Sequence, residues 1–233
     1  MVRPLTLGDE VRDWRIDSAT FSIFPYGDPP DYRDRALTRA ALQWLWPCRT
    51  VMGNRATFAK TTYFEEGRPW HQWHQLTRDP NASTMTITFA FVATHNHFVL
   101  DRGGKVFNRS APVIKLPAGA SVEDHLRLLG VLNSSVACFW LRQNSYNKDE
   151  SRERWEQRHQ LNGMTVKDFP LPGSTPVERP ALLDELARAL QTHSPAEVAK
   201  REIPTAAALD NARAESERLR ALMIAHQEEL DWE

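Results

Sequence analysis

The sequence is poor in cysteine and has no long apolar run. Its two cysteines, Cys48 and Cys138, lie far apart, without the spacing of thiolate zinc ligands or of a small disulfide framework. The N-terminal segment carries acidic residues where a secretory signal would be apolar, and no stretch reaches the about 18 apolar residues of a membrane-spanning helix. We therefore predict a soluble, cytoplasmic protein with reduced thiols and no membrane partner.

The motifs by which many enzymes hold nucleotides are also missing. Neither G-x-G-x-x-G nor G-x-x-x-x-G-K-[ST] occurs, and the pair Gly103-Gly104 is too short to cradle a phosphate. Ser134 and Ser135 have no glycine elbow around them and no base that the sequence places beside them. Helix packing is the better interpretation of both serines, and the sequence indicates no catalytic residue.

Charge is divided unevenly along the chain, although the net charge is only −1. Residues 33–170 contain 19 Lys/Arg and 12 Asp/Glu, whereas residues 205–233 contain 3 Arg and 7 Asp/Glu. A basic surplus is what a surface that binds duplex DNA requires, because neutralised phosphates release counterions. An unevenly charged solvated surface explains the same numbers equally well.

The first half of the chain shows strand periodicity after a proline-rich N-terminal segment. Residues 1–30 end in FSIFPYGDPP, which favours an ordered loop or a short edge strand. Residues 85–94, MTITFAFVAT, alternate with the period of a strand. A second strand is expected at 97–100, followed by Gly103-Gly104 where a tight hairpin turn needs positive φ, and a further strand at 112–116.

Helical spacing of apolar residues predicts helices at 31–46, 122–143, 180–191 and 206–230. Pro47 ends the first of them near Trp44, and Ser121 with Asp124 resembles a capping box at the start of the second. We expect that second helix to break near residues 133–135.

Two other segments are predicted to be irregular. Residues 146–158 should form an exposed charged loop that Trp155 anchors at one end, and a linker containing Pro195 and Pro204 should join the last two helices. The predicted fold is α+β: a mixed or antiparallel β-sheet with packed helices in residues 31–172, after the N-terminal segment 1–30 and before a helical C-terminal region, 173–233.

Histidines form two pairs that invite a metal hypothesis. His71 and His74 make an H-x-x-H pair, and His95 and His97 make an H-x-H pair that would point to one face of a strand. No carboxylate or cysteine lies at a supporting spacing, so ordinary polar histidines are the favoured interpretation and no metal site is predicted.

The segment 101–109 is a better candidate for a functional surface. Arg102, Lys105, Asn108 and Arg109 would project hydrogen-bond donors from a tight turn, and Arg with guanine and Asn with adenine are frequent direct contacts in DNA grooves. Solvated charges on a surface turn are the alternative. Aromatic residues and arginines also crowd together between residues 55 and 74, which suits either a dense core corner or an exposed contact surface.

A set of six segments resembles the target-recognition domain of adenine-specific DNA methyltransferases of the TaqI and Eco57I class, and more closely the PglX-type enzymes of type 2 BREX phage-exclusion systems. The segments are LWPCRTVMGNRATF (45–58), GRPWHQWHQ (67–75), ATHNHFVLDRGGKVFNRSAPVIKLP (93–117), LLGVLNSSVACFWLRQ (128–143), FPLP (169–172) and QEELDWE (227–233). As a set over about residues 10–233 they are specific, whereas each alone is weak.

The resemblance implies a domain that docks on double-stranded DNA and positions a target adenine. A separate catalytic domain would flip that base and methylate it with S-adenosylmethionine. The glycine-rich cofactor loop and the Asn/Asp-Pro-Pro-aromatic tetrapeptide of such a domain are absent from this sequence. We therefore expect a C-terminal fragment or the product of a split gene, without a cofactor of its own and not catalytic alone.

Three functions remain open. The first is DNA target recognition, with double-stranded DNA and the methyltransferase catalytic domain as partners. Its predicted DNA-binding residues are Arg55, Arg68, Asn96, His97, Arg102, Lys105, Asn108, Arg109 and Lys148. The second is a protein-interaction module that docks on other phage-defence components. The third is a histidine metalloenzyme.

Overall fold

The chain forms two compact units in a computed structural model that describes residues 2–27, 36–74, 76, 84–149, 153, 156–201 and 203–232. The smaller unit comprises Met1–Val2 and Ile23–Ala82, and the larger comprises Arg3–Ser22 and Ser83–Glu233. The larger unit therefore takes strands from both sides of the smaller one along the sequence. The two units are described separately.

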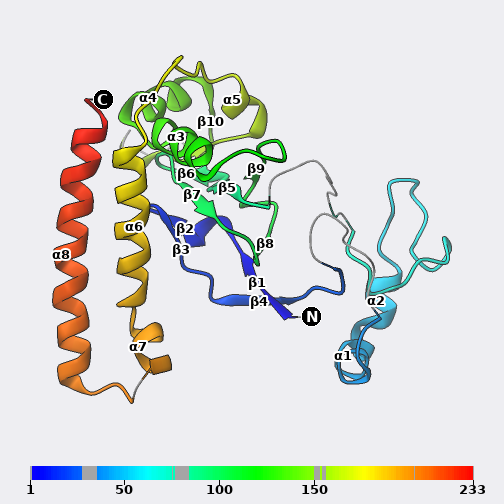
Figure 1. The fold of residues 1–233 in the computed structure, drawn as a ribbon. Coiled ribbons are helices and arrows are strands. Elements are labelled where there is room, and N and C mark those ends of the chain that lie inside the picture. The colour runs from blue at the N-terminus through cyan, green and yellow to red at the C-terminus, as the bar shows by residue number, and fades with distance from the viewer. Residues whose placement is uncertain are drawn as a thin grey trace. The chain divides into compact units, whose positions relative to one another are not determined.

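The smaller unit contains two short helices joined by a 3-10 turn, namely α1 (Arg39–Leu45), η2 (Trp46–Cys48) and α2 (Arg49–Gly53) (Figure 1). The Thr38 hydroxyl caps α1 by accepting a hydrogen bond from the Ala41 amide at 3.3 Å. Pro47 lies within η2, as expected for a proline that closes a helix. The predicted end of the helix near Trp44 is confirmed, whereas residues 31–35 of that prediction lie outside the described residues.

The core of the smaller unit is aromatic. Phe24, Tyr26 and Trp73 meet edge to face, with ring centroids 5.1 Å apart for Phe24–Tyr26 and 5.5 Å apart for Phe24–Trp73. Trp73 is also anchored through its polar atoms, because its amide donates to the Tyr26 hydroxyl at 2.8 Å and its indole N–H to the Ile23 carbonyl at 3.1 Å. These bonds join the start of the unit to its end.

The central sheet of the larger unit has the strand order β7-β5-β9, with β5 (Thr86–Phe89), β7 (Phe98–Asp101) and β9 (Val113–Ile114) antiparallel. Every residue of β5 and β7 is buried, so both faces of these strands are covered. The strands predicted at 97–100 and 112–116 are confirmed. The strand predicted at 85–94 is confirmed in its first half, and the chain then turns into β6 (Val92–Ala93).

Three smaller sheets surround the central one. One has the order β4-β1-β8, from β1 (Val2–Thr6), β4 (Thr20–Ile23) and β8 (Val106–Phe107). A hairpin pairs β2 (Val11–Arg12) with β3 (Arg15–Ile16), and β10 (Tyr146–Asn147) joins β11 (His159–Gln160) and β6 in the order β10-β11-β6. The edge position of β4 agrees with the edge strand that the prolines predict.

The prediction of a tight hairpin at Gly103-Gly104 is wrong. Both glycines have the expected positive φ, +107° and +89°. The strands before and after them do not pair with each other, however, because β7 pairs with β5 while β8 runs parallel to β1, with Leu5 opposite Val106. The two glycines therefore carry the chain from one sheet to another, which local sequence does not reveal.

The described part of the larger unit contains several helices, most of which begin at a capping side chain. They are α3 (Val122–Leu132), α4 (Ser135–Asn144), α5 (Gly163–Lys167), α6 (Glu178–Thr192), α7 (Pro195–Arg201) and α8 (Ala206–Leu230). The capping box at Ser121 and Asp124 is confirmed, as is the break between α3 and α4, where the Ser134 hydroxyl accepts from the Ala137 amide at 3.1 Å. α7 lies in the segment predicted as a linker, and Trp155 lies outside the described residues.

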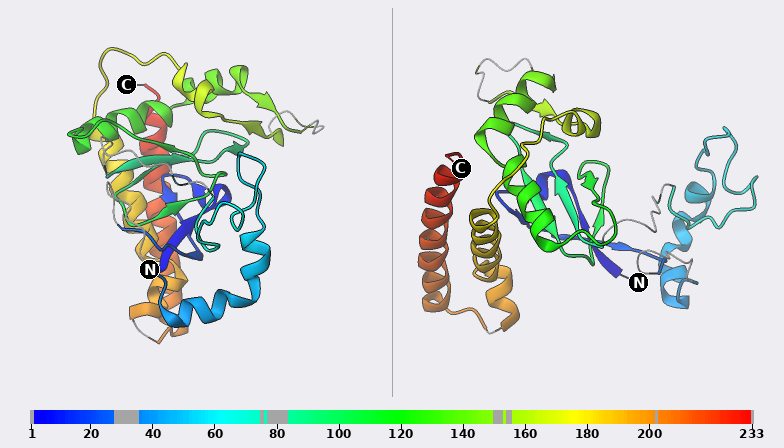
Figure 2. Two further views of the ribbon diagram at one scale, coloured as in Figure 1. Left: turned by 90° about the vertical axis from the view of Figure 1, so that its right-hand side faces the viewer. Right: turned by 45° about the horizontal axis from the view of Figure 1, so that its top comes forward.

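The core of the larger unit is apolar and continuous from the sheet to the helices. α3 packs on β5 and β7, α6 packs on α3, and α6 and α8 lie side by side (Figures 1 and 2). The core residues include Ile87, Phe89, Phe98, Leu126, Leu129, Leu183, Leu219 and Met223. The predicted α+β class is confirmed. Within the described residues, no helix has both the length and the apolar character needed to cross a membrane.

Candidate nucleic-acid interface

Arg102 and Lys105 are held by buried carboxylates. The two terminal nitrogens of Arg102 donate to Asp184 of α6 at 3.1 and 2.6 Å, and Lys105 donates to Asp101 at 2.7 Å. Both carboxylates are almost fully buried, Asp184 at 3% exposure and Asp101 at 3%. Arg188 also donates to Asp184, at 3.1 Å. The Arg102–Asp184 pair fastens the segment after β7 to α6, and a contact of Arg102 or Lys105 with DNA would have to compete with these ion pairs.

Asn96 and His97 point inward. The Asn96 amide donates to the carbonyls of Leu132 and Ser134 at 2.6 and 3.2 Å, which closes the end of α3. His97 is only 5% exposed, and its Nδ1 accepts from the Asp13 amide at 3.3 Å. Through these contacts Asn96 and His97 fix the conformation of the loop between β6 and β7.

Asn108, Arg109 and Lys148 lie on the surface of the larger unit. The Asn108 side chain accepts from the Ser110 amide at 3.3 Å, which makes a local turn. Arg109 is exposed, and the structure records no hydrogen bond or ion pair of its side chain among the described residues. Lys148 is exposed beside Tyr146, with Nζ 5.4 Å from the ring centre. Arg109 and Lys148 are thus accessible to a phosphate.

In the smaller unit, Arg55 and Arg68 enclose Tyr63. Their guanidinium carbons lie 4.4 and 4.5 Å from the centre of the Tyr63 ring, which is fully buried. Arg55 also donates to the carbonyls of Trp70 and Gln72, at 3.0 and 2.6 Å. Within this unit the two arginines stabilise the fold.

The exposed side chains of α1, η2, α2 and the following turn form an aromatic and basic surface. Its apolar members are Trp44, Trp46, Val51 and Phe58, with exposures of 74, 59, 75 and 79%. Arg39, Arg49 and Lys60 are exposed in the same segment, and residues 36–64 contain no acidic residue. Within the predicted aromatic segment Tyr63 is fully buried and Phe58 faces solvent, so the segment contains both core and exposed side chains; contact of the exposed ones with a partner stays a prediction.

The larger unit contains several hollows, among them a charged one and an apolar one. The first, of about 340 Å³, has Arg12 and Arg158 in its lining, together with Asp9, Gly8 and Ser110. Arg12 donates to the carbonyls of Gly8 and Val11, both at 2.6 Å, and Arg158 pairs with Asp149. Arg12 and Arg158 are not among the predicted binding residues, because no local pattern distinguishes them from other surface arginines.

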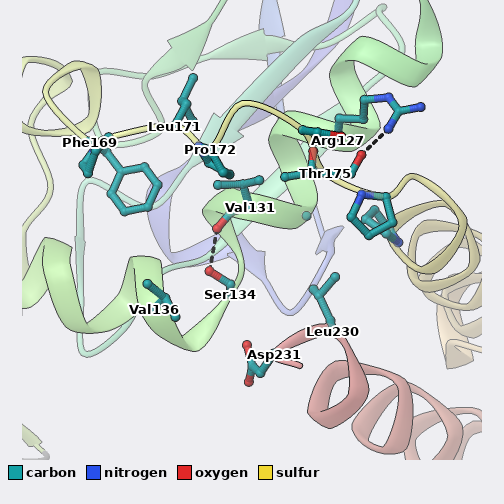
Figure 3. A pocket seen from close by; sticks show the side chains of 15 residues that line it. Arg127, Val131, Ser134, Val136, Phe169, Leu171, Pro172, Thr175, Leu230 and Asp231 are labelled. Carbon is teal, nitrogen blue, oxygen red and sulfur yellow. Dashed lines mark hydrogen bonds between the residues drawn. The ribbon is translucent and has the colours of Figure 1, made fainter. Parts of the chain in front are cut away.

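The second hollow is an apolar groove of about 460 Å³ beside the connection between α3 and α4 (Figure 3). The FPLP segment forms one side of it through Phe169, Leu171 and Pro172, and the end of α8 contributes Leu230 and Asp231. Arg127 donates to the Thr175 carbonyl and fastens the proline-rich segment to α3. The groove can accept an apolar side chain.

Asp13 lies close to His95 and His97, although it is far from both histidines in the sequence. One ligand atom each from Asp13, His95 and His97 lies within 4.8 Å of the other two. The hydrogen bond with His97 lowers the pKa of Asp13 against the effect of its partial desolvation, and partial desolvation together with the neighbouring His97 lowers the pKa of His95. At neutral pH the group therefore presents a carboxylate and a neutral imidazole at His95.

The comparisons with known proteins place this geometry in context. No protein-family model matches the sequence. Over 242 aligned positions the chain is 49% identical to "Adenine-specific methyltransferase PglX" of Streptomyces coelicolor, and the alignment covers the whole chain. The chain spans 20% of the length of that relative. The resemblance to PglX-type sequences is thereby confirmed along the whole chain.

Proposed function

We propose that this chain, similar from end to end to one fifth of PglX, is the part of an adenine-specific DNA methyltransferase that contacts DNA and recognises its target. The observation that carries the proposal is the 49% identity over the whole chain to a protein named for methylation of adenine. The sequence lacks the motifs that bind S-adenosylmethionine or catalyse the transfer. We assign those steps, and the cofactor, to another part of the enzyme, and the protein to cytoplasmic phage defence of the BREX type.

The exposed basic groups indicate where DNA would bind. Phosphates are contacted by Lys and Arg that are not already neutralised, so we assign this role to Arg49 and Lys60 in the smaller unit and to Arg109 and Lys148 in the larger. Asn108 stands next to Arg109 and offers an amide to a base edge. The predicted contacts of Arg102 and Lys105 would require their carboxylate pairs to open, so we rank them below these residues.

The proposal is tested by the fluorescence anisotropy of a labelled mixed-sequence duplex, titrated with the 233-residue chain between about 50 and about 200 mM salt. The logarithm of the association constant should fall linearly with the logarithm of the salt concentration. Arg109→Ala or Arg49→Ala should weaken binding to every sequence and reduce the slope by about one. Lys200→Ala is the matched control, because Lys200 is exposed on α7 but paired with Glu197.

Two results would contradict the proposal. One is an absence of binding at the lowest salt concentration, both for the chain alone and when it is joined to the remaining four fifths of a PglX-type protein. The other is binding whose salt dependence is the same in the wild type and in Arg109→Ala and Arg49→Ala.

The aromatic surface of the smaller unit favours a second candidate, docking on another protein. Trp44, Trp46 and Phe58 each expose more than half of their surface to solvent, which is unusual for such large aromatic residues. Exposed aromatic side chains often anchor protein interfaces. A Trp44→Ser/Phe58→Ser variant separates the candidates. It should retain the salt dependence of DNA binding if the surface serves a protein partner, and lose affinity for DNA if the rings contact bases.

A further inference from the structure

The group formed by Asp13, His95 and His97 has the composition and spacing of a metal site. Two imidazoles and one carboxylate are a common ligand set for zinc and for other divalent transition metals. The Nδ1 of His97 and the Oδ1 of Asp13 lie 3.4 Å apart. Metal bonds of about 2.0–2.1 Å in a tetrahedral arrangement put neighbouring ligand atoms about 3.3 Å apart, so this pair is already at the right separation.

The loop that carries the two histidines is fixed on both sides. Asn96, between them, is anchored to the end of α3 by two hydrogen bonds. Directly after His97, the Phe98 amide donates to the Asn133 side chain at 3.0 Å, and the Asn133 amide group donates back to the Phe98 carbonyl at 2.9 Å. His95 is held at Nδ1 by the Thr94 hydroxyl at 3.0 Å, which leaves its other ring nitrogen for a metal.

The carboxylate reaches the histidines from a strained turn. Asp13 and Trp14 link β2 to β3 with φ values of 45° and 68°, a left-handed conformation that side chains other than glycine adopt only at a cost. The Trp14 indole donates to Gln227 of α8 at 2.9 Å, and its ring lies in the core. These contacts fix the turn in a position that brings the Asp13 carboxylate next to His97.

The group borders a cavity of about 360 Å³ whose lining also includes Met223, Ile224 and Gln227 of α8. Space beside the three side chains matters, because a site with three protein ligands needs room for a water molecule or another ligand. Cys138 also lines this cavity and brings a thiol into it.

We propose that Asp13, His95 and His97 bind one divalent transition-metal ion, of which zinc is the representative. The ion would connect the β2–β3 hairpin to the loop between β6 and β7, two segments that lie more than 80 positions apart in the sequence. The proposal departs from the expectation drawn from the sequence, which found no carboxylate near the H-x-H pair. It does not depend on DNA binding.

The competing arrangement is the one that the hydrogen bonds describe, in which His97 and Asp13 bind only each other. To bind a metal, the three ligand atoms, which now lie up to 4.8 Å from one another, must move closer together. The hydrogen bond between the Asp13 amide and His97 must also give way to a metal bond. The two arrangements predict different responses to zinc, and this difference can be measured on the 233-residue chain.

The test is a titration of the chelator-treated chain with zinc in competition with a chromogenic zinc indicator. The wild type should bind about one ion, and Asp13→Asn and His95→Ala should each weaken binding by roughly tenfold or more. His193→Ala is the control, because His193 lies at the end of α6, outside the group. His95 is exposed, so its loss leaves the fold intact, whereas a variant of buried His97 could fail to fold.

Cobalt supplies a second readout that reports on ligands rather than on affinity. Co²⁺ bound to the wild type should give visible d–d absorption, which should change in Asp13→Asn and remain in His193→Ala. Equal zinc affinity in all four proteins, or zinc bound well below one ion per chain, would overturn the proposal and leave Asp13 and His97 as a hydrogen-bonded pair.

Discussion

Replacing Arg102 by alanine should destabilise the larger unit, because its guanidinium fastens the segment after β7 to α6. The side chain makes two charge-assisted hydrogen bonds with Asp184, at 3.1 and 2.6 Å. The Asp184 carboxylate is almost fully buried, whereas the arginine side chain is 39% exposed. After the substitution, Arg188 remains as a donor to the same carboxylate at 3.1 Å.

The size of the effect follows from these exposures. A hydrogen bond to a charged group contributes about 1.5–3 kcal/mol when it is sheltered from water. The Arg102 side chain is more than a third exposed, so solvent screens the pair and reduces that value. Because Arg188 keeps the carboxylate partnered, the full penalty of a buried unpaired charge does not arise. We expect the free energy of unfolding to fall by about 2 kcal/mol.

Urea denaturation followed by circular dichroism measures the change, and hydrogen exchange with mass spectrometry locates it. Amides of β7 and α6 should exchange faster in Arg102→Ala, while those of α1 and α2 should be unchanged. Arg109→Ala is the matched control, since Arg109 is exposed and the described residues give its side chain no recorded partner. Its effect should stay within about 0.5 kcal/mol.

A loss below about 0.5 kcal/mol in Arg102→Ala would refute the reasoning, because the pair would then contribute no more than an ordinary surface ion pair. Arg102 would in that case be available to another partner, and its predicted contact with DNA would gain weight. The double-mutant cycle with Asp184→Ala distinguishes the cases, since a structural pair should show a coupling free energy of about 1 kcal/mol.

Two further substitutions test packing. Tyr63→Leu should destabilise the smaller unit by about 2–3 kcal/mol, because it removes the ring that Arg55 and Arg68 enclose and leaves a cavity. Hydrogen exchange over residues 36–74 measures the loss of stability, and unchanged exchange would contradict the buried position of Tyr63. Gly130→Ala should cost about 1–3 kcal/mol in urea denaturation, because a Cβ at this position would lie 2.3 Å from Cγ of Pro180; wild-type stability would show that α6 can move away from α3 without cost.

Local sequence was sufficient to predict the helices that have characteristic residues at their ends. The 25-residue helix α8 was predicted with both of its ends, because apolar spacing and the residues before it define a helix without help from the rest of the chain. Ser121 and Asp124 likewise identified the start of α3, and residues 133–135 its end. Apolar spacing does not determine which residues of α8 are buried, since Met223 is buried whereas Leu209 and Leu222 are partly exposed.

Contacts between distant residues were beyond the reach of local patterns. The pairing of β8 with β1 joins Val106 to Leu5, and nothing near Gly103 and Gly104 indicates that partner. Asp13 could not be connected with His95 for the same reason. The composition around Tyr63 correctly signalled an aromatic and basic region, but it did not tell which arginines turn inward. The role of the predicted DNA-binding residues stays a prediction.

Gln227 of α8 links segments from both ends of the chain, and this arrangement bears on the order of events during synthesis. Its carbonyl oxygen accepts from the Trp14 indole at 2.9 Å, and its amide group donates to the Asn133 carbonyl at 3.1 Å. A growing polypeptide cannot complete these bonds until α8 has left the ribosome. Until then the turn at Asp13 lacks one of its supports, and the larger unit remains open. The larger unit therefore closes only after α8 has been synthesised, and in the interval its apolar surface is exposed to chaperones.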